Sequence, residues 1–216
     1  MLKFEDISNE NIDDVFKICS WNRLYASTED PLLVKSREFK RWWLLDMLEK
    51  YGPCTKIAYL DGKPVAQTLF YPEETVPYLH NPRKDVLNLL CVYNPLPETQ
   101  RKGVGAALMK ALLDEGHTGL DCLGGKPCRF VVTRPFPHEG ELPITDFYEK
   151  YGFKQGHQEM FLEIKEKYVP MNIPELSPLP EDYGRTILLY NINCEWGYWY
   201  AMMVRELIQS KHPDHP

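Results

Sequence analysis

The sequence predicts a mixed α/β fold, in which helices flank a central sheet and a short strand–helix unit follows at the C-terminus. Three observations predict it. Apolar runs with strand character alternate with helical patterns over residues 1–166. The Val- and Leu-rich run at 86–93 suits a buried central strand, and a glycine-containing turn then opens a helix at 100–115. A proline-rich stretch at 170–180 separates the remaining residues from this domain.

Length and composition limit the class of protein. The 216 residues can bury one core with a small appendage, and a hydrophobic content of 44% is that of a globular protein. The net charge of −6 argues against a nucleic-acid partner, because a phosphate backbone needs a concentrated basic face. No apolar run approaches the roughly 20 residues that span a membrane, and the N-terminus lacks a signal-peptide core. The six cysteines include no C-x-x-C pair, so we expect reduced thiols in a cytoplasmic protein.

Caps, turn residues and apolar periodicity define the elements expected in the main domain. In chain order these are strand 3–7, helix 9–19, helix 36–50, strands 55–60 and 65–70, strand 86–93, helix 100–115, strand 128–133, helix 144–151 and one long or bulged strand 153–164. Ser8 or Asn9 is expected to cap the first helix, since either side chain can accept a hydrogen bond from a free helix N–H group. Pro31 is expected to keep residues 20–35 irregular, because proline interrupts a helix.

Turns and loops separate these elements. The Asp61-Gly62 pair is a strong signal for a hairpin turn, because this dipeptide tolerates the positive φ angles that such turns need. The segment 72–85 contains three prolines without periodicity and is longer than a simple strand connection, so it is a candidate functional loop. Glycines at 116–127 and prolines at 135–143 mark two further loops.

The turn that precedes the helix at 100–115 predicts an anion-binding site. Gly103 and Gly105 allow successive backbone N–H groups to point at one spot, where the helix dipole adds partial positive charge. Arg101 and Lys102 add full charges at its rim. The pattern lacks the P-loop spacing, and Leu108 stands where a dinucleotide fingerprint has its third glycine. A lone Gly-x-Gly is also consistent with close packing alone, and the residues of the turn leave both interpretations open.

Two motifs together resemble a known family. The Q-x-x-G-x-G pattern at 100–105, after the end of a hydrophobic strand, resembles the acetyl-CoA motif of the GNAT superfamily of N-acetyltransferases. The run FYEKYGF at 147–153 resembles a second GNAT motif, in the expected order and at a plausible distance. The resemblance covers about residues 1–166. It implies a mixed, mostly antiparallel central sheet flanked by helices.

The resemblance also implies a cosubstrate and a mechanism. An amine would attack the thioester of acetyl-CoA directly in a ternary complex. Backbone groups of the strand end and of the glycine turn would bind acetyl-CoA, which assigns to it Leu90, Cys91, Val92, Gln100, Arg101, Lys102, Gly103, Val104, Gly105 and Ala106. Tyr148 is the leading catalytic residue, because its hydroxyl would protonate the departing CoA thiolate or donate a hydrogen bond to the sulfur. Packing beneath the sheet is the alternative role.

The general base is the weakest part of the implied site. Some GNAT enzymes have a glutamate six residues before the end of the central strand, where this chain has Val86. The neighbouring Asp85 is therefore predicted as the base. Other polar candidates are Asn88, Glu73, Glu74, His80, His138, Glu139 and Glu141. Cys91 suggests a covalent acetyl-cysteine route, although a buried cysteine more often acts as a small hydrophobe.

The C-terminal residues predict a separate unit. The expected boundaries are an acetyltransferase-like domain at 1–168, a proline-rich linker at 169–184 and an extension at 185–216 with a strand at 185–190 and a helix at 196–210. The extension resembles the start of a thioredoxin-type fold and the YoaP-like segment that follows some GNAT domains. Cys194 lacks the second cysteine of a dithiol motif. A unit this small cannot bury both its faces, so it must dock on the main domain, pair with another chain or be a remnant.

The expected partner is a small-molecule or peptide amine, with neither nucleic acid, membrane nor metal involved; a homodimer is left open. The resemblance places Trp42 or Trp43 in a wall of the acceptor site, although both suit core packing. Two other functions stay open. One is a non-catalytic acyl-CoA-binding module whose C-terminal segment contacts a partner. The other gives the tail the main function, regulated by CoA bound to the first domain.

Overall fold

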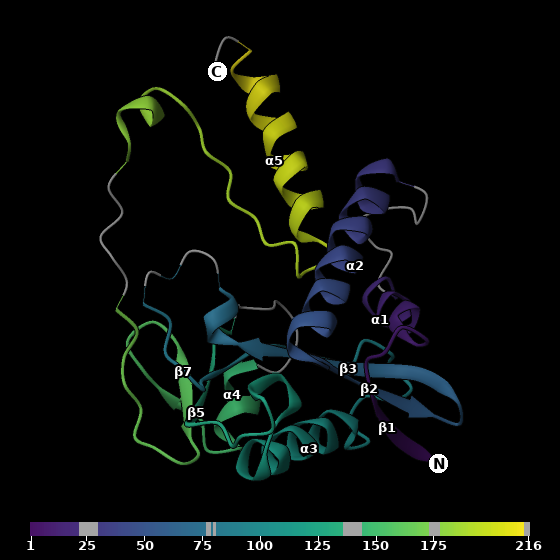
Figure 1. Cartoon of the computed structure of the whole chain (residues 1–216). Helices are drawn as coiled ribbons and strands as arrows, with labels where there is room; N and C mark the ends of the chain where they lie inside the picture. The colour runs from purple at the N-terminus through teal and green to yellow at the C-terminus, as the bar shows by residue number, and fades with distance from the viewer. Residues whose placement is uncertain (22–29, 77–78, 80, 136–143, 173–177, 214–216) are drawn as a thin grey trace.

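The computed structural model describes residues 1–21, 30–76, 79, 81–135, 144–172 and 178–213. Its elements form a sheet with helices on both faces (Figure 1). Within the described residues, no helix is both long enough and apolar enough to cross a membrane. Four candidate bases, namely His80, His138, Glu139 and Glu141, lie outside the described residues.

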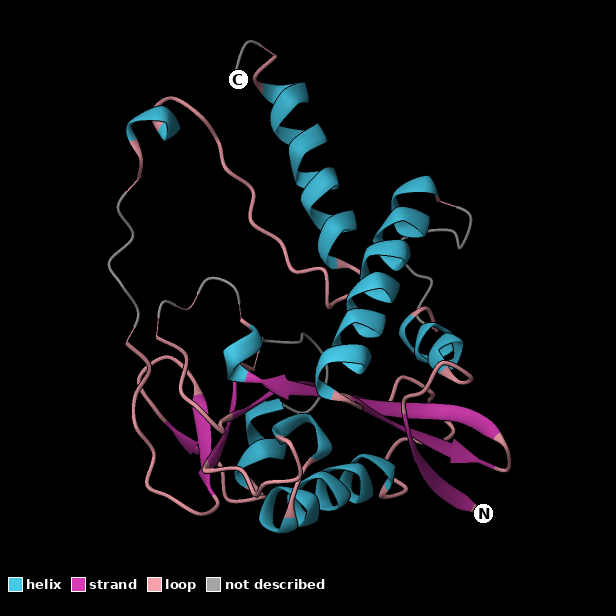
Figure 2. Ribbon diagram, viewed as in Figure 1, coloured by secondary structure: helices cyan, strands magenta, loops and turns pink. Residues whose placement is uncertain are grey.

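One seven-stranded sheet organises the chain, in the order β1-β2-β3-β4-β5-β7-β6 (Figure 2). Its strands are β1 (Leu2–Asp6), β2 (Thr55–Leu60), β3 (Lys63–Pro72), β4 (Leu87–Tyr93), β5 (Phe130–Thr133), β6 (Lys154–Gln155) and β7 (Met160–Glu163). Every neighbouring pair is antiparallel except β4 and β5, which run parallel. The predicted mixed, mostly antiparallel sheet is confirmed.

Five α-helices accompany the sheet in the described residues. They are α1 (Ile12–Cys19), α2 (Pro31–Tyr51), α3 (Val104–Thr118), α4 (Ile144–Glu149) and α5 (Gly197–Lys211), with short 3-10 turns at Glu73–Thr75, Asp121–Leu123 and Pro180–Asp182. Helices α1 and α2 lie on one face of the sheet, and α3 and α4 lie on the other (Figure 1). Successive strand residues point to opposite faces of the sheet, and helices cover both faces, so both carry apolar side chains.

The core follows from this arrangement. On the α3 and α4 face, Leu87 and Leu89 of β4 pack with Leu112 of α3 and Tyr148 of α4. On the α1 and α2 face, strand and helix residues form a second buried cluster: Ile7, Ile12, Val15, Ile18, Cys19, Leu44, Ile57, Tyr59 and Leu69. Burial of these apolar side chains is the main force that holds the helices on the sheet.

Two N-terminal predictions are wrong in detail. Asn11, not Ser8 or Asn9, occupies the cap position of α1, and its side chain accepts a hydrogen bond from the Ser8 N–H at 2.8 Å. Pro31 begins α2 and does not interrupt a helix. The reason is that proline fits the first helical position, where its missing N–H would have no helical partner. Asp30 caps this start, since its Oδ1 accepts the N–H group of Leu32 at 2.8 Å.

The strand predictions differ in outcome. The Asp61-Gly62 turn is confirmed, with φ angles of 50° and 79° between β2 and β3. The single strand predicted at 153–164 is wrong, because β6 and β7 form a hairpin closed by the Gly156 N–H and the Glu159 carbonyl at 2.8 Å. A side chain at Gly156 would lie 2.8 Å from that same carbonyl oxygen, so glycine permits the turn.

The C-terminal extension differs from its prediction in one element. The helix is present as α5, but residues 185–190 form no strand and are mostly exposed; Leu189 is 87% exposed. An extended segment becomes a strand only when another strand pairs with it, and no strand among the described residues pairs with 185–190. Of the three fates open to the extension, the structure shows docking, since α5 packs on α2 (Figure 1).

Gly197 allows this docking. A side chain at position 197 would overlap the backbone carbonyl of Asn191 across the turn that precedes α5. Gly197→Ala is therefore expected to lower the free energy of unfolding by about 2 kcal/mol, the usual effect of overpacking. Urea unfolding measures this. Ser210→Ala, at an exposed position of the same helix, is the control and should change stability by less than about 0.5 kcal/mol. Equal stability of the two variants would contradict the close approach.

Candidate active site

Strands β4 and β5 separate part-way along their length. They pair only where Leu87, Asn88 and Leu89 face β5, and the last pair joins Leu89 to Thr133. β5 ends there, whereas β4 continues to Tyr93. Beyond Leu89, the described structure gives β4 no strand partner on its β5 side. The backbone N–H and C=O groups along that edge are available to an extended ligand.

A β-bulge accompanies the separation. Leu69 of β3 pairs with Cys91 while Phe70 pairs with Leu89, so Leu90 is the extra residue. A bulge bends and twists its strand, which turns the end of β4 away from β5. The Thr68 hydroxyl donates to the Cys91 carbonyl at 3.1 Å and fixes the strand just beyond the bulge. The backbone at Leu90, Cys91 and Val92, predicted to bind the cosubstrate, therefore borders the opening.

The glycine turn lies at the start of α3, just after β4. Gly103 occupies the cap position of α3 with a φ angle of 80°, and no side chain caps the helix there. A side chain at position 103 would meet no atom within 4 Å, so the space beside it is open. Glycine is therefore needed for the positive φ angle and not for lack of room. Arg101 and Lys102 are exposed at the same turn. Uncapped helix N–H groups next to the exposed, positively charged side chains of Arg101 and Lys102 suit a bound anion.

Side chains within the preceding turn hold it in place. The Thr99 hydroxyl donates to Asn94 Oδ1 at 2.6 Å, and Gln100 Nε2 donates to the Asn94 carbonyl at 3.2 Å. The Gln100 side chain therefore positions the turn. Gly105 joins the turn to the rest of the site, since a side chain there would lie 3.8 Å from Val92 and 3.9 Å from Phe147. Helix α3, strand β4 and helix α4 meet at this point.

Tyr148 projects from α4 toward the separated strands. It is only 2% exposed and lies against the rings of Phe147 and Phe153. Burial raises the pKa of Tyr148 to about 12. The nearby Thr133 side chain opposes this increase in the pKa of Tyr148. The two hydroxyls do not meet the geometry of a hydrogen bond, so Thr133 Oγ1 is buried without a partner. Sequence reasoning missed Thr133, whose position at the end of β5 becomes evident only from strand pairing.

Asp85 does not lie at this opening. It occupies the turn before β4 with a φ angle of 55°, and its carbonyl accepts the Arg129 N–H at 2.9 Å. Leu90 follows five residues later along an extended strand, which places the two about 16 Å apart. This position argues against Asp85 as the base, which stays a prediction. That prediction followed closeness in sequence, whereas a strand carries its ends far apart.

The other described acidic candidates lie in ion pairs or away from the opening. Arg83 binds the Glu73 carboxylate and donates from Nη1 to Glu159 Oε1 at 2.6 Å. Arg134 binds the second Glu159 oxygen at 3.0 Å. Glu74 is exposed in the 3-10 turn after β3. None of these three carboxylates is therefore free beside Leu90.

Cys91 is a poor nucleophile in this structure. Burial raises the pKa of its thiol to about 12, so it stays protonated at neutral pH. The two tryptophans of α2 differ in their surroundings. Trp42 is 60% exposed, whereas Trp43 packs edge-on against Tyr71 of β3, with ring centres 5.5 Å apart. Trp43 is therefore the one that faces the sheet.

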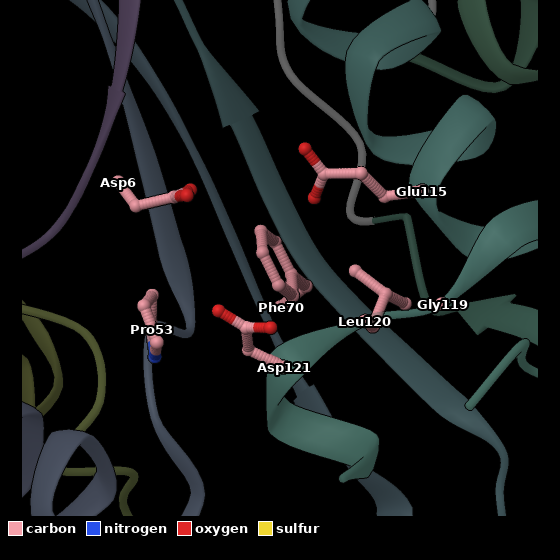
Figure 3. A pocket seen from close by; sticks show the side chains of 7 residues that line it. All are labelled: Asp6, Pro53, Phe70, Glu115, Gly119, Leu120 and Asp121. Atoms are coloured by element: carbon pink, nitrogen blue, oxygen red, sulfur yellow. The ribbon is translucent and has the colours of Figure 1, made fainter. Parts of the chain in front are cut away.

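A separate hollow of about 160 Å³ lies elsewhere (Figure 3). It is lined by Asp6, Pro53, Phe70, Glu115, Gly119, Leu120 and Asp121. Its carboxylates Asp6 and Glu115 both bind Lys56, at 2.5 and 2.7 Å. Since Gly119 ends α3 and Gly103 begins it, this hollow lies at the opposite end of that helix from the glycine turn. It is not part of the candidate site.

No protein-family model matches the chain, and no curated protein does. Solved structures do match. A GNAT family acetyltransferase from Brucella melitensis, in complex with acetyl-CoA, is 17% identical with a TM-score of 0.53 over 80% of this chain and 94% of its own. The ribosomal-protein-S18-alanine N-acetyltransferase of Escherichia coli is 14% identical, with a TM-score of 0.51 over 80% of this chain and all of its own.

The chain has the GNAT fold. Ard1 of Thermoplasma volcanium is a third similar structure, 17% identical with a TM-score of 0.51 over 76% of this chain and 97% of its own. These identities are low, so the likeness establishes the GNAT fold and not an activity. It confirms the fold that the two sequence motifs implied. The resemblance of the tail to a YoaP-like segment stays a prediction.

The raised pKa of Tyr148 gives a test of its burial. A group whose pKa is higher in the folded state adds stability below its unfolded pKa of about 10 and loses that stability as pH rises through the folded value. Because that folded pKa is about 12, wild-type protein should lose about 2 kcal/mol more than Tyr148→Phe between pH 9 and pH 12. Urea unfolding of both proteins across this range measures it. Parallel stability curves would show that Tyr148 is solvated.

Proposed function

We propose that the protein is an N-acetyltransferase that transfers the acetyl group of acetyl-CoA to a primary amine by direct attack in a ternary complex. One observation carries the proposal: the bulged end of β4, unpaired on its β5 side, leads through the turn at 94–103 into an uncapped helix N-terminus. A ligand that matches this surface has an extended, amide-containing arm and a phosphate group at its other end. Coenzyme A has both.

The two parts of the surface would bind different parts of the cosubstrate. Backbone groups of Leu90, Cys91 and Val92 would pair with the pantetheine arm as a short added strand. Amides of residues 101–106 would bind the pyrophosphate, and the exposed Arg101 and Lys102 would supply the charge. The thioester would then lie near Leu90, where the strands part. The Brucella neighbour, solved in complex with acetyl-CoA, supports this choice of ligand.

Tyr148 would act on the leaving group. After the amine attacks the thioester carbonyl, the C–S bond breaks and negative charge collects on sulfur. Because burial raises the pKa of Tyr148 to about 12, its phenol is a much weaker acid than a thiol with a pKa near 8.5. A hydrogen bond from the hydroxyl to the sulfur is therefore favoured over complete proton transfer. Such a bond stabilises charge where it develops in the transition state.

The amine would lose its proton without a carboxylate base. Asp85 is remote from Leu90 and Glu74 is exposed. Glu73 and Glu195 are bound to Arg83 and Arg37. The attacking fraction is then set by the pKa of the amine itself, with solvent as proton acceptor.

This scheme predicts the pH dependence. The rate constant kcat/KM should rise tenfold per pH unit until the pKa of the acceptor amine is reached. The whole pH profile should shift to lower pH when a less basic amine replaces it. Asp85→Asn should leave kcat/KM within about 2-fold, because Asp85 lies about 16 Å along the strand from Leu90. Steady-state rates from pH 6 to 10 measure both. A pH profile that is independent of the amine would require an enzymic base.

A non-catalytic acyl-CoA-binding module is the second candidate, favoured by the shortage of free carboxylates at the opening. Tyr148→Phe distinguishes the two. In an enzyme it should retain acetyl-CoA binding and lower kcat by at least 10-fold, since one well-placed donor to a developing charge is worth about that or more. In a binding module, wild type and variant bind acetyl-CoA equally, and no amine increases thiol release.

The glycine turn provides a matched pair of variants for cosubstrate binding. Gly103 and Gly62 have φ angles of 80° and 79°, and a side chain at either would meet no atom within 4 Å. Gly103→Val and Gly62→Val therefore impose the same backbone strain, which a β-branched residue tolerates poorly. Only Gly103→Val should weaken acetyl-CoA binding, by at least 10-fold, as measured by calorimetry. Equal binding by both variants, or none by the wild type, would refute the proposed site.

A further inference from the structure

The turn before α5 is locked into the main domain by a buried carboxylate. Glu195 is fully buried, and its Oε1 accepts the Ser20 hydroxyl at 2.5 Å and Arg37 Nε at 3.0 Å. Its backbone carbonyl accepts the Ser36 hydroxyl. The C-terminal turn, residues 191–196, thus bridges the end of α1 and the inner side of α2 (Figure 1).

The same turn also reaches the sheet. Asn193 is 8% exposed, and its Nδ2 donates to the Tyr71 hydroxyl at 3.3 Å. Tyr71 lies on β3 opposite Asn88 of β4, two residues before the bulge at Leu90. The C-terminal turn therefore lies over the α1 and α2 side of the strands that border the candidate site.

Cys194 lies between these two anchored residues. Both of its neighbours are buried, whereas Cys194 itself is exposed. It directly follows Asn193, whose amide reaches Tyr71 on the strand that pairs with β4. Cys194 is therefore a solvent-facing residue of the turn that contacts the sheet two residues from the bulge at Leu90.

Buried polar atoms around the turn point to a ligand with N–H groups. Asn193 Oδ1, Glu195 Oε2 and Gln67 Oε1 are all buried and accept no hydrogen bond. Gln67 Nε2 and Lys40 Nζ both donate to Cys19 Sγ, at 2.8 and 3.1 Å, which links this group to the sulfur cluster. Buried acceptors are costly unless a donor reaches them, and Asn193 Oδ1 and Glu195 Oε2 are two such atoms on this one turn.

The two sides of β4 are not equally open to an incoming amine. On the α3 and α4 side, a side chain at Gly105 would lie 3.8 Å from Val92 and 3.9 Å from Phe147, and Tyr148 is 2% exposed. Close packing blocks approach from there. On the other side, the C-terminal turn contacts Tyr71 of β3, and its Cys194 thiol is exposed.

We propose that the C-terminal turn completes the amine-acceptor channel and that Cys194 limits the size of the amine that can pass to the thioester. Asn193 and Glu195 hold the turn in position and offer their free oxygens to N–H groups of the acceptor. Cys194 acts through its volume and undergoes no covalent step. This inference rests on the proposed acetyltransferase function, because it assigns the route of the acceptor in that reaction.

The test uses full-length protein and compares Cys194→Trp, Cys194→Ala and Cys194→Ser with wild type. A control, Leu189→Trp, adds the same ring to an 87% exposed position of the same tail. Acetyl-CoA binding is measured by calorimetry, and kcat and KM are measured for primary amines of increasing size. Cys194→Trp should raise KM at least 10-fold for the larger amines with acetyl-CoA binding unchanged within 2-fold. Cys194→Ala should accept larger amines than wild type, and Cys194→Ser, which removes the thiol but nearly keeps its volume, should keep the wild-type size limit. Leu189→Trp should match wild type.

The outcomes separate the two proposals. If wild type turns over amines but Cys194→Trp keeps the wild-type size profile, the channel is wrong and the acetyltransferase stands. If Leu189→Trp changes the profile as much as Cys194→Trp, the effect is general to the tail and the role of Cys194 is wrong. If wild type binds no acetyl-CoA or acetylates no amine, the proposed function fails and the channel with it.

Discussion

The candidate site depends on one constraint, which is that β4 cannot stay paired with β5 beyond Leu89. The extra residue at Leu90 bends β4, and β5 ends at Thr133. If β4 and β5 remained paired to Tyr93, the backbone groups at 90–92 would be consumed by the sheet and Tyr148 would face a closed ladder. A single inserted residue therefore converts structural hydrogen-bonding groups into groups that can bind a ligand.

The same bend places the end of β4 before the glycine turn. Because the turn is held by Asn94, Thr99 and Gln100 through hydrogen bonds of its own, it needs no ligand to keep its shape. An anion would meet N–H groups that are already oriented, so little conformational entropy is lost on binding. Preorganisation by side chains inside the turn explains why Gln100 belongs to the motif even though its side chain points inward.

The sequence predicted the parts of the fold that local chemistry decides. Gly103 and the Asp61-Gly62 turn were predictable because only residues that tolerate positive φ suit them. A proline can either end a helix or begin one, so Pro31 alone did not predict the start of α2. The preceding Asp30, which caps the helix, is the signal that distinguishes the two cases. Thr133 and the docking of Glu195 could not be predicted, since each depends on residues far away in sequence. The distance between Asp85 and Leu90 could not be predicted for the same reason, because it depends on how the strand is paired in the sheet.

The buried carboxylate of Glu195 explains why the tail has one position. Desolvation of a charge offsets much of its attraction to Arg37, so such a pair adds less to stability than its contacts suggest. Its geometric demand is strict, however, because Glu195 Oε1 is satisfied only where Ser20 and Arg37 donate together. Apolar contacts between α5 and α2 alone would tolerate sliding along the helix. The polar lock does not, and it therefore fixes Cys194 relative to the bulge in β4, which is what a residue that gates a channel requires.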